Sequence, residues 1–204
     1  MVLQGITMKL YGSTTSPFVR RIRLYLALNK ANDHEFVNLD IFSEQGRAQL
    51  VKDNPTLKVP YLIDNEQHIL DSRVIYRYLA QKFAQPTLSW DEENLLTLID
   101  AANDSFVTLF LLKRSGLDNQ QDLLFFNLQN ERVATVVKLL NDTVEKGDFK
   151  EWNYPSICLF CLLDWANLRE LYPFEKYDGL VEFVKNINAK PELAAVLAET
   201  DPRN

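Results

Sequence analysis

Ser16 is the residue whose place in the sequence most strongly suggests chemistry. An apolar run that ends at Gly12 predicts a strand, and the turn-forming residues 13–16 lead to Pro17, which is favoured in the first turn of a helix. A hydroxyl at a helix start lies beside free backbone N–H groups and the positive end of the helix dipole, which together stabilise an anion. The same position also suits an ordinary helix cap, so capping and catalysis both remain open. The apolar residues that follow repeat at helical spacing: Phe18, Ile22, Tyr25 and Leu26.

The segments around Ser16 predict an α/β domain in residues 1–84, because strand and helix patterns alternate there. The expected order is βαβαββα, that of a thioredoxin-like domain whose elements are short enough to need a partner for stability. After the first helix, strands are expected at residues 34–39, 59–63 and 67–70, a short helix at 43–52, and a further helix from Asp71-Ser72 onward.

Residues 85–90 contain Pro86 and interrupt the periodicity, which predicts a linker followed by an all-helical bundle over residues 91–204. A long helix is expected to end near Ser115-Gly116, and Asp118 is expected to cap the next one. Residues 157–168 are apolar on all sides, which indicates a buried central helix. The long helix is predicted from the spacing of Leu95, Leu98, Ile99, Ala102, Phe106, Leu109 and Phe110.

Composition narrows the class of protein. The 204 residues are 47% hydrophobic with a net charge of −6, which argues against a nucleic-acid binder. Residues 1–84 hold 11 Lys and Arg against 8 Asp and Glu, so this part is mildly basic and suits a small anionic ligand, although solvated surface explains the imbalance equally well. With no signal-peptide pattern, no apolar run of about 18 residues and no disulfide framework, we expect a soluble cytoplasmic protein without membrane attachment.

Neither the cysteines nor the histidines are expected to form a metal or redox site. Cys158 and Cys161 have the spacing of a redox pair, but they lie in the helix expected to be most buried, which favours two small core residues. His34 and His68 are solitary, so no metal is expected.

Three segments together resemble the cytosolic glutathione transferase superfamily: residues 16–21 (Ser-Pro-Phe-Val-Arg-Arg), Val59-Pro60, and residues 71–79 beginning Asp-Ser-Arg. The resemblance covers essentially the whole chain, including the helical second half. Ser16 falls where the serine-dependent, zeta and tau-like classes carry their catalytic serine, and where other members carry a cysteine. Bacterial members with a similar Ser-Pro-Phe segment look most similar. The sequence departs from the family at residues 153–156, Asn-Tyr-Pro-Ser, where members usually carry Ser/Thr-x-x-Asp before the buried helix. Asn153 can still cap this helix, and the Ser156 side chain can still form the return hydrogen bond to the backbone of the cap residue.

The resemblance implies a glutathione site. Ser16 would stabilise the thiolate, the backbone of Val59 before a cis Pro60 would pair with the peptide, and Lys58 would reach the glycine carboxylate. Asp71 and Ser72 would hold the γ-glutamyl group. From the residues alone, a strand-starting proline, a surface lysine and an ordinary Asp71 cap remain possible.

The predicted function is a glutathione transferase-like enzyme that attacks a small hydrophobic electrophile. Phe106 and Phe110 are candidates for the wall of the electrophile pocket, and both could equally belong to the bundle core. A homodimer is expected from the resemblance, with Asp100 or Asp104 reaching the glutathione of the partner subunit. Two alternatives remain: a glutathione-dependent peroxidase or reductase, which the absence of a cysteine at position 16 weakens, and a non-catalytic adaptor similar to stringent starvation protein A.

Overall fold

The computed structural model describes residues 8–31 and 33–203, and contacts divide the chain into two compact units. The first unit runs to Thr87 and also includes the residues from Glu192 onward, and the second is Leu88–Pro191. In the first unit the elements are β1 (Met8–Gly12), α1 (Pro17–Leu28), β2 (His34–Asn38), α2 (Glu44–Asp53), β3 (Tyr61–Asp64), β4 (Gln67–Leu70), α3 (Ser72–Lys82) and α8 (Pro191–Glu199). In the second they are α4 (Trp90–Arg114), α5 (Leu124–Lys146), α6 (Tyr154–Leu168), the 3-10 turn η1 (Phe174–Lys176) and α7 (Asp178–Asn188).

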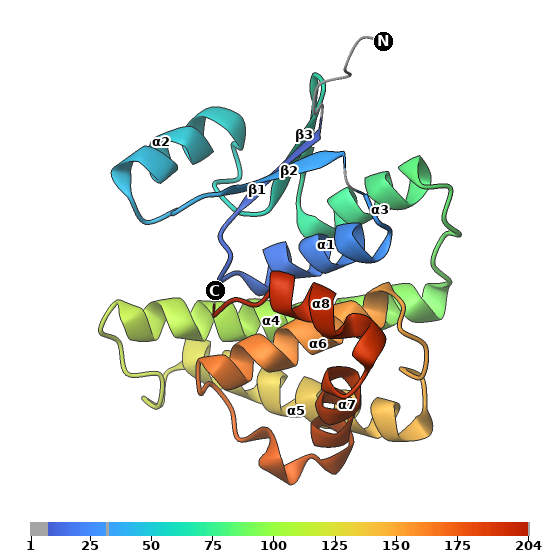
Figure 1. Ribbon diagram of the computed structural model, residues 1–204. Helices are drawn as coiled ribbons and strands as arrows, with labels where there is room; N and C mark the ends of the chain where they lie inside the picture. Colours follow the sequence, from blue (N-terminus) through green and yellow to red (C-terminus); the bar gives the residue numbers. More distant parts are fainter. Residues whose placement is uncertain (1–7, 32, 204) are drawn as a thin grey trace, which may run out of the picture. The chain divides into compact units, whose positions relative to one another are not determined.

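The first unit is built on a four-stranded sheet with the strand order β2-β1-β3-β4. β1 is parallel to β2 and antiparallel to β3, and β4 is antiparallel to β3. Helices α1 and α3 cover one face of the sheet and α2 covers the other (Figure 1). Because side chains alternate along a strand, Leu10 and Leu62 share one face, whereas Tyr11 and Tyr61 stack on the other with ring centroids 4.6 Å apart. The βαβαββα order followed by helices confirms the predicted fold class.

Strand boundaries differ slightly from the predicted ones. β2 ends at Asn38, one residue before the expected Leu39, and β3 begins at Tyr61, after Val59 and Pro60. Pro60 has no N–H to donate to a ladder, so the regular pairing starts only after it.

The last part of the chain associates with the first unit, whereas the sequence placed residues 91–204 together in the helical domain. The Arg23 guanidinium of α1 donates to the carbonyl oxygen of Glu199 at 2.8 Å. Thr200, directly after α8, is buried. The boundary between Thr87 and Leu88 lies inside the segment 85–90 that was expected to be a linker.

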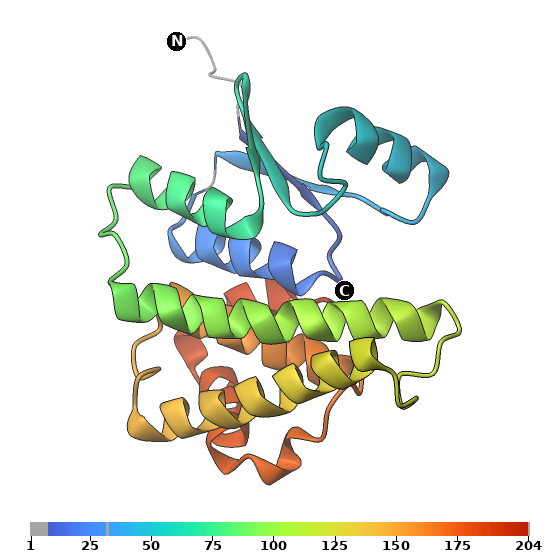
Figure 2. The ribbon, with the colours of Figure 1, turned by 180° about the vertical axis from the view of Figure 1, so that it is seen from behind.

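The second unit consists of helices, seen from behind in Figure 2. α4 starts with a capping box, in which Ser89 and Glu92 exchange side-chain and backbone hydrogen bonds, and it packs against α5 and α6. α6 is buried on nearly all sides, and Cys158 and Cys161 within it are fully buried free thiols, which confirms their prediction as core residues. Asn153 caps α6 by accepting from the Ser156 N–H at 3.2 Å, but the Ser156 hydroxyl donates to the Glu151 carbonyl instead of returning to Asn153.

The prediction that Asp118 caps the second long helix is wrong. α5 begins only at Leu124, and its N-cap residue, Leu123, provides no side-chain hydrogen bond. The Asp118 carboxylate instead accepts from the Gln120 N–H at 2.9 Å, which stabilises a turn between α4 and α5. Asp favours both kinds of local hydrogen bond, so its position alone does not distinguish a turn from a cap.

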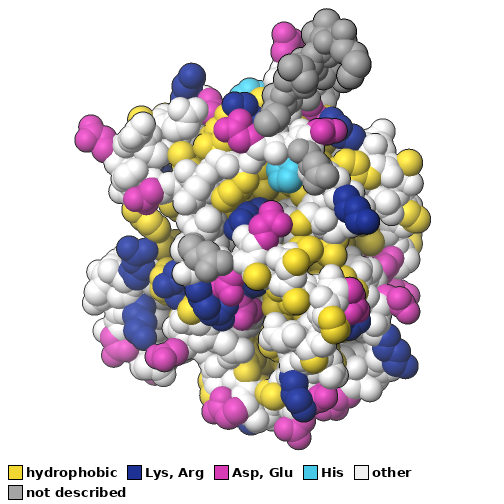
Figure 3. All heavy atoms as spheres, viewed as in Figure 1, with side chains coloured by type: hydrophobic (Ala, Val, Ile, Leu, Met, Phe, Trp, Pro, Cys, Tyr) yellow, Lys and Arg dark blue, Asp and Glu magenta, His cyan; other side chains and the backbone are white. Residues whose placement is uncertain are grey.

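Within the described residues, α4 is the one helix whose length and composition would allow it to cross a membrane. A core helix of a globular protein meets the same criterion. Leu96, Ile99 and Phe106 of α4 are buried, and the helix packs against α5 and α6, so we interpret α4 as a core helix. On the face shown in Figure 3, acidic and basic side chains are interspersed with apolar ones.

A glycine fixes the packing of β1 against α1. A Cβ atom added to Gly12 would lie 2.4 Å from Cγ2 and 2.9 Å from Cγ1 of Val19, which is fully buried. Gly12→Ala is therefore expected to destabilise the protein by about 1–3 kcal/mol in denaturant unfolding, because the β-branched Val19 cannot easily rotate away. In the double variant Gly12→Ala/Val19→Ala, the added methyl group fits where the Val19 methyl groups were. The decrease in the free energy of unfolding should therefore be smaller than the sum of the decreases in the two single variants. Additive losses would contradict the proposed clash.

Candidate functional site

The register of the sheet brings three of the predicted site segments to one edge. Tyr11 of β1 pairs with Tyr61 of β3, which pairs in turn with Leu70 of β4. The residues directly beyond these pairs are Gly12, Pro60 and Asp71. The turn that carries Ser16, the Val59-Pro60 segment and the Asp71-Ser72 helix start therefore leave the sheet at the same edge.

Ser16 is the N-cap residue of α1, and its side chain is partly exposed. The Val19 N–H donates to Ser16 Oγ at 3.4 Å, and the Ser16 backbone is extended (φ −87°, ψ 128°). The oxygen thus accepts one hydrogen bond while its own O–H can donate another to a ligand. Ser16 can therefore cap α1 and also contribute to the anion site that the sequence predicts.

Two of the other three hydroxyl residues before α1 share a hydrogen bond between their side chains. Ser13 Oγ and Thr15 Oγ1 share a hydrogen bond of 3.0 Å, and the Thr14 N–H donates to Asn38 Oδ1 at 3.2 Å. This second contact ties the turn to the end of β2. The turn before Ser16 is therefore fixed by one hydrogen bond within the turn and by another to the end of β2.

The start of α1 carries basic side chains and no acidic residue in its first turn. Arg20 and Arg21, in its second turn, are only 3% and 0% exposed, and the Arg21 guanidinium lies 4.7 Å from the centre of the Phe18 ring. The positive end of the helix dipole at the start of α1 favours an anion, whereas the charge of Arg20 acts on Asp201 and helps to lower the pKa of that carboxyl group. The sequence motif contains both arginines, but nothing in their spacing indicated that they are buried.

The segment before β3 is organised by Asn54, which the sequence indicated only as the end of α2. Asn54 is fully buried. Its Nδ2 donates to the Lys58 carbonyl at 2.7 Å, and its Oδ1 accepts from the N–H and the hydroxyl of Thr56 at 2.9 and 2.8 Å. One side chain therefore satisfies three polar groups of the loop that leads to Val59.

The peptide bond between Val59 and Pro60 is cis, as the resemblance implied. Within the described residues, the backbone N–H and C=O of Val59 make no hydrogen bond, so both groups remain able to pair with an extended peptide. The Lys58 side chain is exposed.

Asp71 caps α3, accepting from the Arg73 N–H at 2.8 Å, and has φ 73°. Positive φ is uncommon for a residue other than glycine, and such conformations cluster at ligand sites. Ser72, the first residue of α3, is 3% exposed. The structure thus places both residues at a helix N-terminus, where a carboxylate is stabilised.

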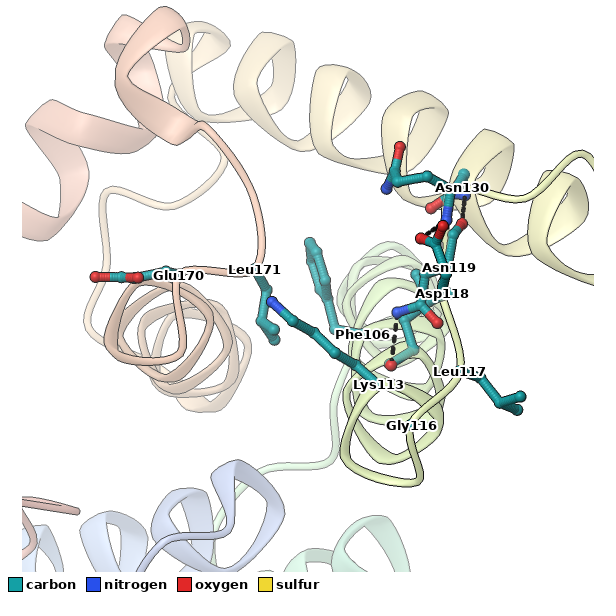
Figure 4. A pocket seen from close by; sticks show the side chains of 11 residues that line it. Phe106, Lys113, Gly116, Leu117, Asp118, Asn119, Asn130, Glu170 and Leu171 are labelled. Atoms are coloured by element: carbon teal, nitrogen blue, oxygen red, sulfur yellow. Dashed lines mark hydrogen bonds between the residues drawn. The ribbon is translucent and has the colours of Figure 1, made fainter.

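The two candidate pocket residues on α4 have different surroundings. Phe106 lines a cavity of about 610 Å³ in the helical unit (Figure 4), and its ring packs edge-on against Tyr172 at 5.9 Å. Phe110 does not line that cavity; it packs against Trp165 at 5.6 Å, and the Arg169 guanidinium lies 5.4 Å from its ring centre.

The remaining sequence candidates do not assemble into a further site. His34 Nδ1 lies 2.5 Å from the Ala31 carbonyl and His68 Nδ1 lies 3.2 Å from the Asp53 carbonyl. Among residues 8–31 and 33–203, no group of three or more His, Cys, Asp or Glu side chains could hold a metal ion. Asp100 is half-buried and Asp104 is exposed, and their role towards a partner subunit stays a prediction.

Comparisons with known proteins agree with this fold. Residues 10–87 match the family model of the glutathione S-transferase N-terminal domain. The GST-like protein YibF of Escherichia coli is 29% identical over 201 residues, covering 92% of this chain and 96% of YibF. Glutathione S-transferase Z2 of Arabidopsis thaliana is 34% identical over 143 residues, and the match spans 69% of this chain and 60% of that protein.

Among solved structures, a glutathione S-transferase from Methylobacillus flagellatus KT with GSH bound is similar, with a TM-score of 0.78 and 22% identity. The match covers 93% of this chain and 98% of that one. The first unit therefore matches a glutathione S-transferase N-terminal domain, and the whole chain has the fold of solved glutathione transferases and is similar in sequence to members of that superfamily. Its assignment to a zeta or tau-like class stays a prediction.

Proposed function

We propose that this protein is an enzyme that binds glutathione and activates its thiol for attack on a small electrophile. The observation that carries the proposal is the position of Ser16, whose Oγ accepts from the first turn of α1 and retains an O–H to donate. The solved relative that contains GSH supports glutathione as the ligand.

The energetics of thiol activation fit these residues. A free thiol has a pKa of about 8.5, so only about 3% is thiolate at pH 7. Lowering the pKa by about two units would raise the thiolate to about three quarters and requires about 2.7 kcal/mol of stabilisation. A hydrogen bond to a charged acceptor contributes about 1.5–3 kcal/mol, and a helix N-terminus up to about 2 kcal/mol. Ser16 and α1 can therefore supply the shift.

In the proposed reaction the thiol proton leaves to solvent and the Ser16 O–H donates to the sulfur anion. The sulfur then forms a bond to the electrophilic carbon, and either a leaving group departs from that carbon with its bonding electron pair, or the π bond of an activated alkene breaks and the neighbouring carbon takes a proton from water. Val59 would pair with the backbone of glutathione, Lys58 would reach its glycine carboxylate, and Asp71 and Ser72 would hold the γ-glutamyl amine and carboxylate. Phe106, and with less structural support Phe110, would contact the electrophile. A homodimer and a cytoplasmic location remain part of the proposal.

Ser72→Ala tests the glutathione site. We expect calorimetry with reduced glutathione to show binding to the parent protein, weakened in the variant by about 1–3 kcal/mol, because a charged group then lacks a partner. Ser43→Ala is a matched control: Ser43 caps α2 through the Gly46 N–H at 3.0 Å and is not proposed to touch glutathione. Absence of both heat and a thermal shift with the parent protein at millimolar glutathione would favour the adaptor function instead.

A further inference from the structure

The cavity lined by Phe106 lies entirely in the helical unit and has features that the glutathione proposal does not use. Its volume of about 610 Å³ is in the range of small-molecule sites. The wall is formed by the C-terminal part of α4, the turn at residues 116–120, Asn130 of α5 and the Glu170-Leu171 segment. Among residues 8–31, 33–87 and 192–203 of the first unit, none lines it.

The apolar part of this cavity suits a ring-sized group. Phe106 is 2% exposed and Leu109 is 9% exposed, so both side chains are fixed in the core and only a small part of each borders the cavity. Leu171 approaches from the opposite side (Figure 4). Phe106 is held in place by edge-on contact with Tyr172 and a tilted contact with Phe174 at 6.1 Å.

One basic side chain reaches across the cavity. Lys113 extends from α4 towards Leu171, across the space beside Phe106, and in the part of the chain that the structure describes its ammonium group forms no salt bridge (Figure 4). Two acidic residues also line the cavity, but the Asp118 carboxylate accepts the Gln120 N–H, and the Glu170 carboxylate points away from Phe106. A ligand would therefore meet a lysine without a counter-ion.

A polar group at another side of the cavity is also incompletely satisfied. Asn119 donates from Nδ2 to the Leu109 carbonyl at 2.8 Å, and its backbone carbonyl accepts from Asn130 at 3.3 Å. Its Oδ1 is buried and has no hydrogen-bond partner among the described residues. A buried acceptor without a donor carries a free-energy cost, and a ligand O–H or N–H would remove it once the Asn119 segment moves enough to open this oxygen to the cavity.

We propose that this cavity binds a small organic carboxylate with a ring-sized apolar body and a hydroxyl or amino group at its far end. The carboxylate pairs with Lys113, the body packs against Phe106, Leu109 and Leu171, and the donor satisfies Asn119 Oδ1. Binding of such an acid does not require the proposed glutathione-dependent reaction. That the electrophile of this reaction binds in the same cavity rests on the proposed function, and in that case the electrophile is itself a carboxylic acid.

The experiment titrates the full-length protein with 4-hydroxyphenylacetate, without glutathione, and follows backbone and Asn side-chain signals by ¹⁵N NMR. We expect saturable binding in the millimolar range or tighter, with shifts concentrated at residues 113–120 and 170–171. 4-Hydroxyphenylacetamide, the neutral isostere, should bind about five- to tenfold more weakly, because it lacks the charge that Lys113 pairs with. Phenylacetate should also bind more weakly, because it lacks the donor for Asn119.

Three variants make the test specific. Lys113→Gln should weaken binding of the acid about five- to tenfold and leave binding of the amide unchanged, whereas Lys113→Arg should retain most of the affinity. Lys185→Gln, which removes an exposed lysine of α7, is the matched control and should change neither. Failure to bind, equal affinity for the acid and the amide, or shifts elsewhere in the protein would overturn the proposal. Because no glutathione is present, none of these results depends on the glutathione site.

Discussion

Ser16→Ala is expected to lower turnover at pH 7 by about ten- to a hundredfold while changing glutathione affinity little. The factor corresponds to about 1.4–2.8 kcal/mol of lost thiolate stabilisation. Raising the pH should recover part of the rate, because more of the thiol then ionises without the hydroxyl. The thiolate can be followed directly by the ultraviolet absorbance of the glutathione complex as pH is varied.

The structure shows that Ser16→Ala also removes a helix cap, so the two effects must be separated. Loss of the Val19 N–H···Ser16 Oγ contact alone should cost about 0.5–2 kcal/mol of stability. Ser43→Ala removes the equivalent cap of α2 and should reduce stability similarly without altering the thiol titration. If Ser16→Ala has the parent thiol titration and turnover, Ser16 has no catalytic role, and Ser13, Thr14 and Thr15 become the next candidates.

Asp64→Ala is expected to destabilise the protein by about 2–3 kcal/mol in denaturant unfolding. The Asp64 carboxylate is 1% exposed and accepts from the Tyr78 hydroxyl at 2.7 Å and from the Lys82 ammonium. Removing it leaves both partners short of an acceptor, although Lys82 is 40% exposed and can be rehydrated, which limits the loss. The matched control is Asp142→Ala, which breaks the exposed Lys138–Asp142 pair and should cause no measurable change.

The same carboxylate makes stability depend on pH. Burial alone would raise the pKa of Asp64, but the hydrogen bonds from Lys82 and Tyr78 outweigh it, so the pKa is lowered. A carboxyl group whose pKa is lower in the folded state stabilises the fold above its unfolded pKa of about 4, and this contribution disappears as the pH falls through the folded value. Asp64→Asn should therefore show less loss of stability below about pH 4 than the parent. Parallel pH profiles would contradict this assignment.

Local patterns predicted the elements of the fold because each depends on nearby residues. The Ser-Pro start of α1 and the apolar residues of α6 lie within one or two helical turns of the feature that they specify. Asp118 was misinterpreted because an Asp that stabilises a turn and an Asp that caps a helix look alike in sequence.

Three other features could not be predicted in this way, and two of them depend on contacts between residues far apart in the sequence. The burial of Arg20 and Arg21 follows from tertiary packing, and basic residues on a helix ordinarily indicate a solvated face. Asn54 organises its loop through contacts within four residues, but an Asn-Pro pair ordinarily marks only a helix end. The cavity beside Phe106 combines α4, α5 and the segment after α6, which no single stretch of sequence contains.

The return of residues 192–203 to the first unit has a consequence for the order in which the protein is completed during its synthesis. Glu199, whose carbonyl accepts from Arg23 of α1, is made 176 residues after that arginine, with the whole helical unit between them. Because segments generally fold as they emerge from the ribosome, α1 must wait for this contact until residues 88–191 have been made. The unit that is translated first is therefore the last to acquire its full set of contacts.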